Sequence, residues 1–345
     1  MSNPESAVPS QAEIKARIAS LCKPPGSLGV IEQVAERLCM TQRTLLPRTQ
    51  PRSVTVFAAD HGVTQEGVSA WPSAITRSVV EQMQHSRTAS GVFADTLRCH
   101  YEVVDVGLLE PLGQYGDGAL NCARRRGSGN LRCEAALTEK DFQHAWQVGE
   151  ERASHAIDAG NHLLLGGEMG IGNTTAATCL IALFCQLQST AEIDAIVGTG
   201  AGADASQMMR KQTAIRDAVG RVRSLGIEEP QQIGRHVGGL EIVALAGYFV
   251  GGAVRGATLL IDGVIATSAA VLAAAVQPGV QRQMMAAHRS TEPAQQVALK
   301  SLGLEPVLNL QMRLGEATGA LAALPLLDLA ASMINDMASI DELQA

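Results

Sequence analysis

The sequence predicts an α/β protein with a mostly parallel, doubly wound sheet that carries helices on both faces. Short apolar segments rich in β-branched residues alternate with longer, alanine-rich segments of helical spacing, and this alternation is typical of parallel sheets. Most of the short segments end in a glycine-containing turn, as expected where strands finish at one ligand-binding edge. The chain has 345 residues, enough for one large domain or two smaller ones.

The expected elements can be placed in order along the chain. Two helices are expected at 11–22 and 30–45, separated by the proline- and glycine-containing loop 23–29. Buried strands are expected at 53–59, 101–107, 162–167, 193–198 and 257–263. Helices are expected at 79–96, 142–160, 174–188, 205–224, 240–254, 264–276, 294–302 and 316–339, with an irregular region at 277–293. The apolar runs 242–254 and 263–276 are shorter than the roughly 18 residues of a membrane span, so we expect buried helices and no membrane partner.

Composition excludes some classes of function. The formal net charge is -7 and the basic residues are scattered, which argues against a nucleic-acid partner. The one basic run, Arg124-Arg125-Arg126, is either a solvated turn or a neighbour of an anionic ligand. Seven cysteines without a CxxC pair indicate reduced thiols and a cytoplasmic protein. Residues 1–5 lack a basic and apolar leader, so no signal peptide is expected.

Two glycine-rich turns are suited to an anion. The turn at 166–175 leads directly into a helix, where free backbone N–H groups and the hydroxyls of Thr174 and Thr175 favour a phosphate. The turn at 198–204 forms a second such loop, and Lys211 lies close enough in sequence to add charge. Neither turn has the Walker pattern or a full dinucleotide fingerprint. Tight packing turns, and an exposed helix position for Lys211, are the alternative interpretations.

Several acidic residues lie at positions where a catalytic or binding role is expected. Glu316 stands between two glycines in an apolar stretch, so desolvation should raise its pKa and make it a better proton acceptor; the alternative is a helix-opening acid. Glu168 lies in the first glycine turn, where we favour a site role. Asp60 follows the first strand and is either a site residue or a turn residue. His61 has no second histidine at ligand spacing, so no metal site is expected. Glu241 and Asp262 are equally consistent with buried structural acids.

Several motifs, in order along the chain, together resemble the nicotinate-nucleotide:5,6-dimethylbenzimidazole phosphoribosyltransferase family of cobalamin lower-ligand assembly. The stretches that carry the resemblance are 23–29, 59–63, 167–175, 237–242, 262–263, 288–290 and 313–319. The resemblance implies transfer of the 5-phosphoribosyl group from nicotinate mononucleotide to a nitrogen of dimethylbenzimidazole. The pyridinium leaving group is already activated by its charge, so neither a metal nor another cofactor is expected.

The resemblance also implies roles for individual residues. Glu316 would be the general base, and Glu168 would stabilise positive charge developing on the sugar. The phosphate and ribose would be bound by Gly170, Gly172, Asn173, Thr174, Thr175, Gly198, Gly200, Gly202 and Lys211. The aromatic base would be bound by Asp60, His61, Ser69, Ser73, Met169 and Leu314. The enzyme would be a homodimer, with a large α/β substrate-binding domain at 30–304 and a small helical domain made of 1–29 and 305–345.

The chain departs from the family pattern in three places, one of which is the second glycine turn, 198–204, which differs in detail from the common form. Ile75-Thr76-Arg77-Ser78-Val79 stands where relatives tend to have Val-Thr-x-Gln-Met, in the segment lining the base pocket. Glu292-Pro293-Ala294-Gln295 stands where they have Glu-Pro-Gly-His. A non-catalytic carrier of nucleotides or benzimidazoles on the same fold is the alternative function. A dinucleotide-dependent oxidoreductase ranks last, because the first strand ends in Asp60-His61-Gly62 instead of a dinucleotide fingerprint.

Overall fold

A computed structural model describes residues 8–343, so the expectation about a leader at residues 1–5 lies outside the described residues. Its centre is a seven-stranded sheet, parallel throughout, with the order β3-β2-β1-β4-β5-β6-β7. The strands are β1 (Arg52–Ala59), β2 (His100–Gly107), β3 (Ala119–Asn121), β4 (Leu163–Met169), β5 (Thr258–Ile261), β6 (Met284–His288) and β7 (Pro306–Leu308). The predicted class is confirmed.

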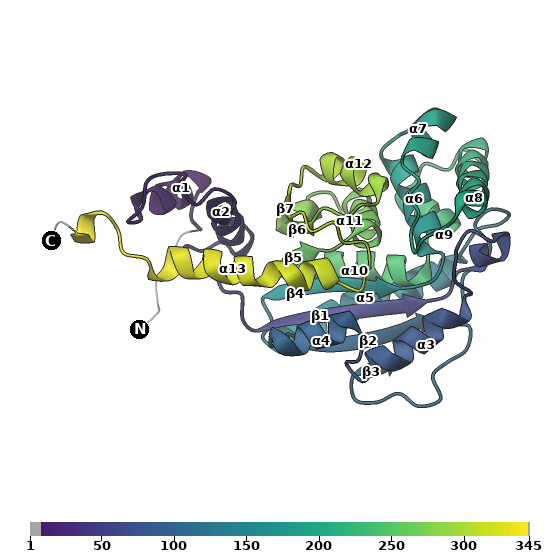
Figure 1. The fold of residues 1–345 in the computed structure, drawn as a ribbon, viewed down its shortest axis with the longest axis horizontal. Coiled ribbons are helices and arrows are strands. Elements are labelled where there is room, and N and C mark those ends of the chain that lie inside the picture. Colours follow the sequence, from purple (N-terminus) through teal and green to yellow (C-terminus); the bar gives the residue numbers. More distant parts are fainter. Residues whose placement is uncertain (1–7, 344–345) are drawn as a thin grey trace.

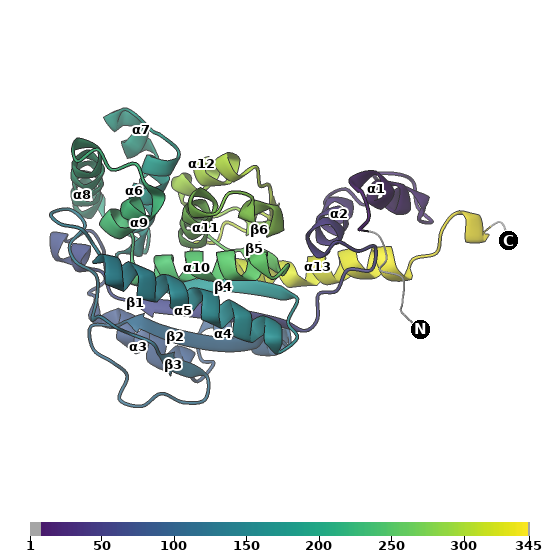
Figure 2. The same ribbon diagram turned by 180° about the vertical axis from the view of Figure 1, so that it is seen from behind.

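Helices cover both faces of this sheet (Figures 1 and 2). One face packs against α5 (Glu139–Asp158), α6 (Asn173–Phe184), α8 (Ala205–Ser224), α9 (Pro230–Val237), α10 (Leu240–Val254), α11 (Val264–Val276) and α12 (Pro293–Leu302). The other packs against α1 (Gln11–Ser20), α2 (Val30–Gln42), α3 (Ala74–Met83), α4 (Ala89–Thr96) and α13 (Thr318–Asp336). A short helix, α7 (Thr190–Ala195), and the 3₁₀ turns η1 (Gly62–Glu66), η2 (Val280–Gln283) and η3 (Asp341–Leu343) complete the described chain.

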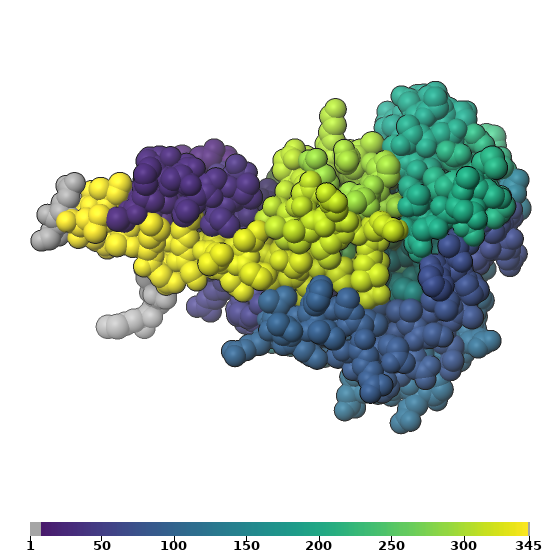
Figure 3. Space-filling model, in the orientation of Figure 1, coloured from purple at the N-terminus to yellow at the C-terminus, as the bar shows by residue number. Residues whose placement is uncertain are grey.

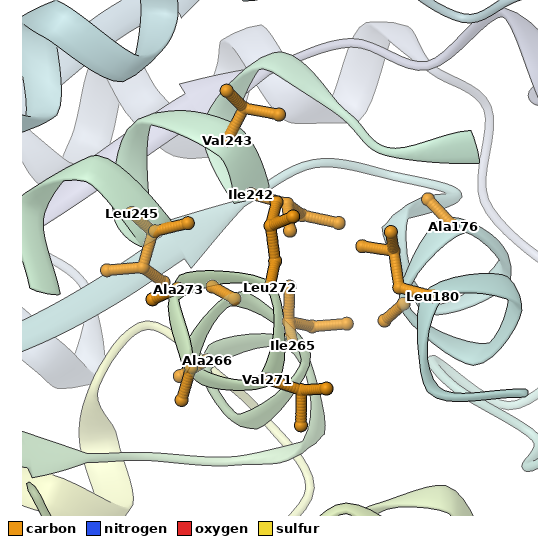
Figure 4. Close-up of a cluster of buried hydrophobic side chains, with 14 of the residues drawn as sticks. Ala176, Leu180, Ile242, Val243, Leu245, Ile265, Ala266, Val271, Leu272 and Ala273 are labelled. Atoms are coloured by element: carbon orange, nitrogen blue, oxygen red, sulfur yellow. The ribbon is translucent and has the colours of Figure 1, made fainter. Parts of the chain in front are cut away.

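The two cores follow from the alternation of side chains along each strand. In β1, Phe57 and Ala59 point into the first core, whereas Val54, Val56 and Ala58 point into the second. Because both faces are covered, all eight residues of β1 are buried. In the first core, side chains of α6, α10 and α11 meet, among them Leu180, Ile242 and Leu272 (Figure 4).

The two ends of the chain meet away from the rest of the molecule. Helices α1 and α2 pack with the far end of α13, and Leu21 forms an isolated bridge with Ser339. This terminal lobe projects beyond the amino ends of the strands (Figures 1 and 3). The sheet itself continues to β7, past residue 304, where we expected the large domain to end. The division of the chain into two domains stays a prediction.

Some expected elements were wrong. The run 193–198 is not a strand: Ser189 and Glu192 form a capping box that starts α7, and an apolar run this short fits either structure. The expected helix 79–96 is two helices, α3 and α4, interrupted where Ser86 adopts a φ of 52°. The region expected to be irregular contains β6, and β3, β7 and α9 were not expected. Strands of three residues give too short a pattern to detect.

One described helix, α13, is long and apolar enough to cross a membrane by length and composition alone. Of the 18-residue window tested, 61% is buried inside the protein against α2, α4 and the sheet. A buried core helix of this kind passes the same test, so the observation is weak evidence for a span. The runs 242–254 and 263–276 form α10 and α11, both largely buried.

The strand order reverses between β1 and β4, because the chain moves to β2 and β3 on one side and to β5, β6 and β7 on the other. Open α/β sheets bind ligands beyond the carboxyl ends of the strands at such a switch point. Here β1 ends beside Asp60 and His61, and β4 ends at Glu168 and Met169. The fold therefore brings together turns that are more than 100 residues apart in sequence.

Candidate active site

A cavity of about 530 Å³ opens beyond the carboxyl ends of β4, β5 and β6. Its wall combines the first glycine turn, the second glycine turn, the loop after β6 and the segment that precedes α13. The predicted site residues that line it are Ser69, Glu168, Met169, Gly170, Gly172, Asn173, Thr174, Gly200 and Leu314. Sequence motifs from four separate stretches thus share one cavity.

One end of the cavity is suited to an anion. Gly172, with a φ of 97°, is the N-cap of α6 and supplies no side-chain cap. The Asn173 and Thr175 N–H groups donate to the Gly170 and Gly172 carbonyls, so the Thr174 N–H is the donor of the first turn that remains for an anion. Behind the turn, Lys211 is buried and its Nζ donates to Thr174 Oγ1 and to the Gly198 carbonyl, both at 2.8 Å. Burial lowers the pKa of Lys211 to about 8, against the opposing charge of Glu292. The lysine therefore holds the two glycine turns together and adds positive charge beneath them.

Two residues that the sequence reasoning did not assign also shape this end. Glu292 lines the cavity, and its Oε1 accepts a hydrogen bond of 2.8 Å from the Gly200 N–H. Arg313 donates to the Gly200 carbonyl at 2.8 Å. Glu292 begins the stretch 292–295 that departs from the family pattern, and Arg313 begins the motif 313–319. Their placement in these stretches was the available signal.

A buried acid forms another part of the wall. Glu168 is buried at the end of β4, and one of its carboxylate oxygens accepts a hydrogen bond from the Asn173 amide. Burial, followed by the charges of Glu241 and Asp262, raises the pKa of Glu168 well above its usual range. Without a cation beside it, this carboxyl group therefore tends to hold a proton. The favoured site role for Glu168 agrees with its position in the cavity wall.

Glu316 lies immediately behind the wall and does not line the cavity itself. It follows Gly315, where an added Cβ would lie 2.5 Å from Glu168 Oε1. The side chain is buried, and its Oε2 accepts a hydrogen bond of 3.0 Å from Ser90 Oγ. Burial is the largest cause that raises the pKa of Glu316, and Asp262 adds to it. The first turn of α13 is bound instead by Asp262, whose Oδ1 accepts from the Ala320 N–H at 2.9 Å.

The loop after β6 is fixed by a buried glutamine. Gln295 Oε1 accepts from the Ser290 N–H at 2.6 Å, and its Nε2 donates to the carbonyls of Asp262 and His288 at 3.0 and 3.1 Å. His288 lines the cavity and lies 3.4 Å from Asp262 Oδ1. The residue that departs from the family pattern thus ties the ends of β5 and β6 together.

Three residues expected at the aromatic base do not line the cavity. Asp60 accepts hydrogen bonds from Ser73 and from the Leu109 N–H, and so ties the loops after β1, β2 and η1. His61 Nε2 lies 2.6 Å from Glu241 Oε1, and both side chains are fully buried. The charge of Glu241 outweighs the effect of burial and raises the pKa of His61.

The remaining predicted residues lie close to the wall or at its rim. Thr175 is buried in α6, Gly198 carries the carbonyl that Lys211 binds, and Gly202 is exposed with a φ of 103°. Trp71, which was not assigned, lines the open side, and its Nε1 donates to the Ala201 carbonyl at 3.3 Å.

Two other features lie outside the cavity wall. Within the basic run, Arg126 pairs with Asp105, and Arg124 and Arg125 with Asp141. Among residues 8–343, no group of three or more His, Cys, Asp or Glu side chains is placed to hold a metal ion.

Comparison with known proteins identifies the class of enzyme to which this fold and this cavity belong. Residues 4–344 match the family model described as "Phosphoribosyltransferase". The chain is a phosphoribosyltransferase.

Named relatives of the chain agree on one family. It is 40% identical over 328 residues to the nicotinate-nucleotide--dimethylbenzimidazole phosphoribosyltransferase of Chromobacterium violaceum, covering 95% of this chain and 93% of that protein. It is 40% identical over 344 residues to the Mycobacterium tuberculosis protein of the same name, covering 99% and 92%. The crystal structure of the Thermus thermophilus enzyme of this name superimposes with a TM-score of 0.90 at 38% identity over 97% of both chains. The chain belongs to the nicotinate-nucleotide–dimethylbenzimidazole phosphoribosyltransferase family, and the resemblance seen in its sequence is confirmed.

Proposed function

We propose that this enzyme transfers the 5-phosphoribosyl group of nicotinate mononucleotide to 5,6-dimethylbenzimidazole, with Glu316 as the general base. The products are α-ribazole 5′-phosphate and nicotinate. The names of the relatives support the two substrates. They also favour a transferase over a non-catalytic carrier on the same fold.

The observation that carries the proposal is that one cavity wall combines the glycine turns above the buried Lys211 with the buried carboxyl group of Glu168. Nicotinate mononucleotide has a dianionic phosphate at one end of its ribose and a cationic pyridinium nitrogen on the anomeric carbon. The glycine turns above Lys211 suit the phosphate. The buried carboxyl groups of Glu168, Asp262 and Glu316 suit the cationic carbon.

The reaction then needs no group beyond the side chains named. The bond between the anomeric carbon and the pyridinium nitrogen breaks, and its electron pair neutralises the departing nicotinate ring. The positive charge that develops on the sugar favours the ionised form of Glu168, which stabilises the transition state. One benzimidazole nitrogen bonds to the carbon from the opposite face, and the proton on the other nitrogen passes to Glu316. Phosphate binding holds the carbon in place during this exchange.

The aromatic base has a separate place at the open side of the same cavity. Met169, Leu314 and Trp71 line the cavity, and Leu314 and Trp71 are more than half exposed. We propose that the benzimidazole binds among them, with Ser69 near its polar edge. The position of Glu316 two residues after Leu314, which lines the cavity, supports proton transfer from a base held there.

We also propose that the enzyme is a cytoplasmic homodimer. All seven cysteines lie within the described residues and are free thiols, as in a reducing compartment. Apolar side chains on neighbouring helices are exposed, including Val92 (51%) and Phe93 (38%) of α4 and Leu329 (59%) of α13. Such a surface suits a second copy of the chain. Sedimentation equilibrium at micromolar concentration gives the mass, and a single-chain mass would overturn the dimer.

Replacement of Glu316 by Gln tests the assignment of the base. Glu316→Gln keeps the size of the side chain and can still bind the Ser90 hydroxyl, but it cannot accept a proton. We expect turnover to fall by about two to four orders of magnitude, while nicotinate mononucleotide binds with nearly unchanged affinity. Nicotinate release, followed by chromatography, measures turnover, and calorimetry measures binding. Near-normal turnover of Glu316→Gln would show that another group is the base.

A matched control separates the two acids. Glu168→Gln also removes a buried carboxylate, but at the position proposed to stabilise the sugar cation. We expect it to weaken nicotinate mononucleotide binding as well as turnover, because the cationic substrate is present before the reaction begins. Equal effects of the two variants on binding would contradict this division of roles.

A further inference from the structure

The carboxyl group of Glu316 meets the beginning of α4, a helix for which the mechanism above has no use. Ser90, in the first turn of α4, is completely buried, and its Oγ donates to Glu316 Oε2 at 3.0 Å. The same Oγ lies 3.0 Å from Thr88 Oγ1 and 3.0 Å from the Tyr101 hydroxyl. Three hydroxyl groups therefore converge beside the proposed base.

The hydrogens of this group can be assigned by counting. A serine hydroxyl has one hydrogen and two lone pairs. A carboxylate can only accept, so the Ser90 hydrogen is directed at Glu316 and its lone pairs accept from Thr88 and Tyr101. All three O–H bonds then point along the chain toward the carboxylate. This arrangement favours the ionised form of Glu316, because a charged carboxylate accepts the Ser90 hydrogen more strongly than a neutral carboxyl group does.

Other surroundings of Glu316 favour its protonated form. The titratable groups that face it are Glu168 at the end of β4, Asp262 at the end of β5 and Tyr101 of β2, and His288 pairs with Asp262. Burial and the charge of Asp262 favour the protonated carboxyl group, whereas the hydroxyls of Ser90 and Thr88 and the Ser90 N–H favour the carboxylate. A base must be ionised before it accepts a proton, so this balance decides whether the enzyme is active at a given pH.

We propose that Ser90, held in orientation by Thr88 and Tyr101, is a positioning residue that keeps Glu316 ionised and fixes one of its oxygens while the other accepts the proton of the benzimidazole. This inference rests on the proposed role of Glu316. It assigns to α4 a part in the reaction, although no residue of α4 lines the cavity.

The test is the pH dependence of turnover in Ser90→Ala. The acid limb of kcat reports ionisation of the base in the substrate complex. Loss of a hydrogen bond to a charged group should move this limb upward by about one to two pH units. Turnover at low pH then falls by about ten- to a hundredfold and recovers at high pH, and the KM for nicotinate mononucleotide stays within about twofold. A purely structural role of Ser90 would lower kcat at every pH.

Matched variants complete the experiment. Thr96→Ala removes an exposed hydroxyl from the same helix and should leave the acid limb of the kcat–pH profile at its original pH. Tyr101→Phe and Thr88→Val each remove one donor to Ser90, and both should move the limb in the same direction by a smaller amount. They also serve if Ser90→Ala does not fold. An unmoved acid limb in folded Ser90→Ala, or in both of the other two, overturns the inference. If Glu316→Gln is inactive in that case, only the role of Ser90 fails; if Glu316→Gln is active, the assignment of the base fails first.

Discussion

Lys211 offers the most direct test of the phosphate end, because its charge is buried and its contacts are few. Its Nζ donates to Thr174 Oγ1 and the Gly198 carbonyl, one in each glycine turn. Lys211→Met keeps most of the buried aliphatic stem and removes the ammonium group. The fold should survive, since methionine adapts to irregular apolar space.

The expected magnitude follows from the loss of a charged donor. A hydrogen bond to a charged group contributes about 1.5–3 kcal/mol, so the Kd for nicotinate mononucleotide should rise about ten- to 150-fold. The pH dependence gives a second signature. With a pKa of about 8 in the free enzyme, Lys211 is charged below that pH and neutral above it. Affinity should therefore be complete below pH 8 and fall by up to about tenfold per pH unit above it.

Isothermal calorimetry from pH 6.5 to 9.5 measures both effects. Lys140→Met, an exposed lysine at the start of α5, is the matched control and should bind as the unchanged protein does. In Lys211→Met the decline above pH 8 should disappear. If Lys211→Met binds within about threefold of the unchanged protein, or if the decline persists, the lysine does not contribute its charge to the phosphate.

Three further predictions concern the residues that support the cavity. His61→Asn should cost about 3–5 kcal/mol of unfolding free energy, because it leaves Glu241 buried without its partner. Because the pKa of His61 is raised in the folded protein, the stabilisation is complete below the unfolded pKa near 6.5 and is lost as pH rises through the folded pKa. The variant should lack this pH dependence of stability. Gly315→Ala should reduce turnover at least tenfold while costing only about 1–3 kcal/mol of stability, because φ is 86° and the new Cβ would lie 2.5 Å from Glu168 Oε1. Gln295→Ala should cost about 3 kcal/mol in urea unfolding, because it leaves buried groups of two strand ends without partners.

Each of these predictions has a control of the same residue type. His85→Asn and Gln296→Ala change exposed side chains and should leave unfolding unchanged. Gly113→Ala adds a Cβ that meets no atom within 4 Å and should leave turnover unchanged. A loss in a control equal to the loss in its partner would contradict the corresponding argument. So would a pH dependence of stability that survives in His61→Asn.

The sequence predicted the elements whose patterns are long, and most residues expected from the first glycine turn line the cavity. Strand β1 is a continuous β-branched run, and α8 begins with the capping pair Asp204 and Gln207. Glu168 could be placed because an acid within a glycine turn after a buried strand must lie at the edge of the sheet. In each case a local pattern determines the outcome.

The parts that could not be predicted depend on distant contacts. Nothing near Ser90 in sequence indicates that it meets Glu316, 226 residues later. His61 follows a strand, as a site residue would, but the approach of Glu241 at 2.6 Å draws it behind the cavity wall. The order of the strands in the sheet determines which turns become neighbours, and no local sequence pattern predicts that order.

The proposed phosphate end also bears on how such enzymes should be mapped by mutation. Its proposed donors include main-chain N–H groups of the glycine turns, and an alanine scan leaves those groups in place. An alanine scan would detect this part of the cavity chiefly through losses at its glycines. At Gly170, for example, an added Cβ would lie 2.6 Å from the Ala59 carbonyl oxygen. A mutational survey that skips glycines, or that ranks positions by side-chain chemistry, would detect Glu168 and Glu316. It would miss the glycine turns that are proposed to bind the phosphate.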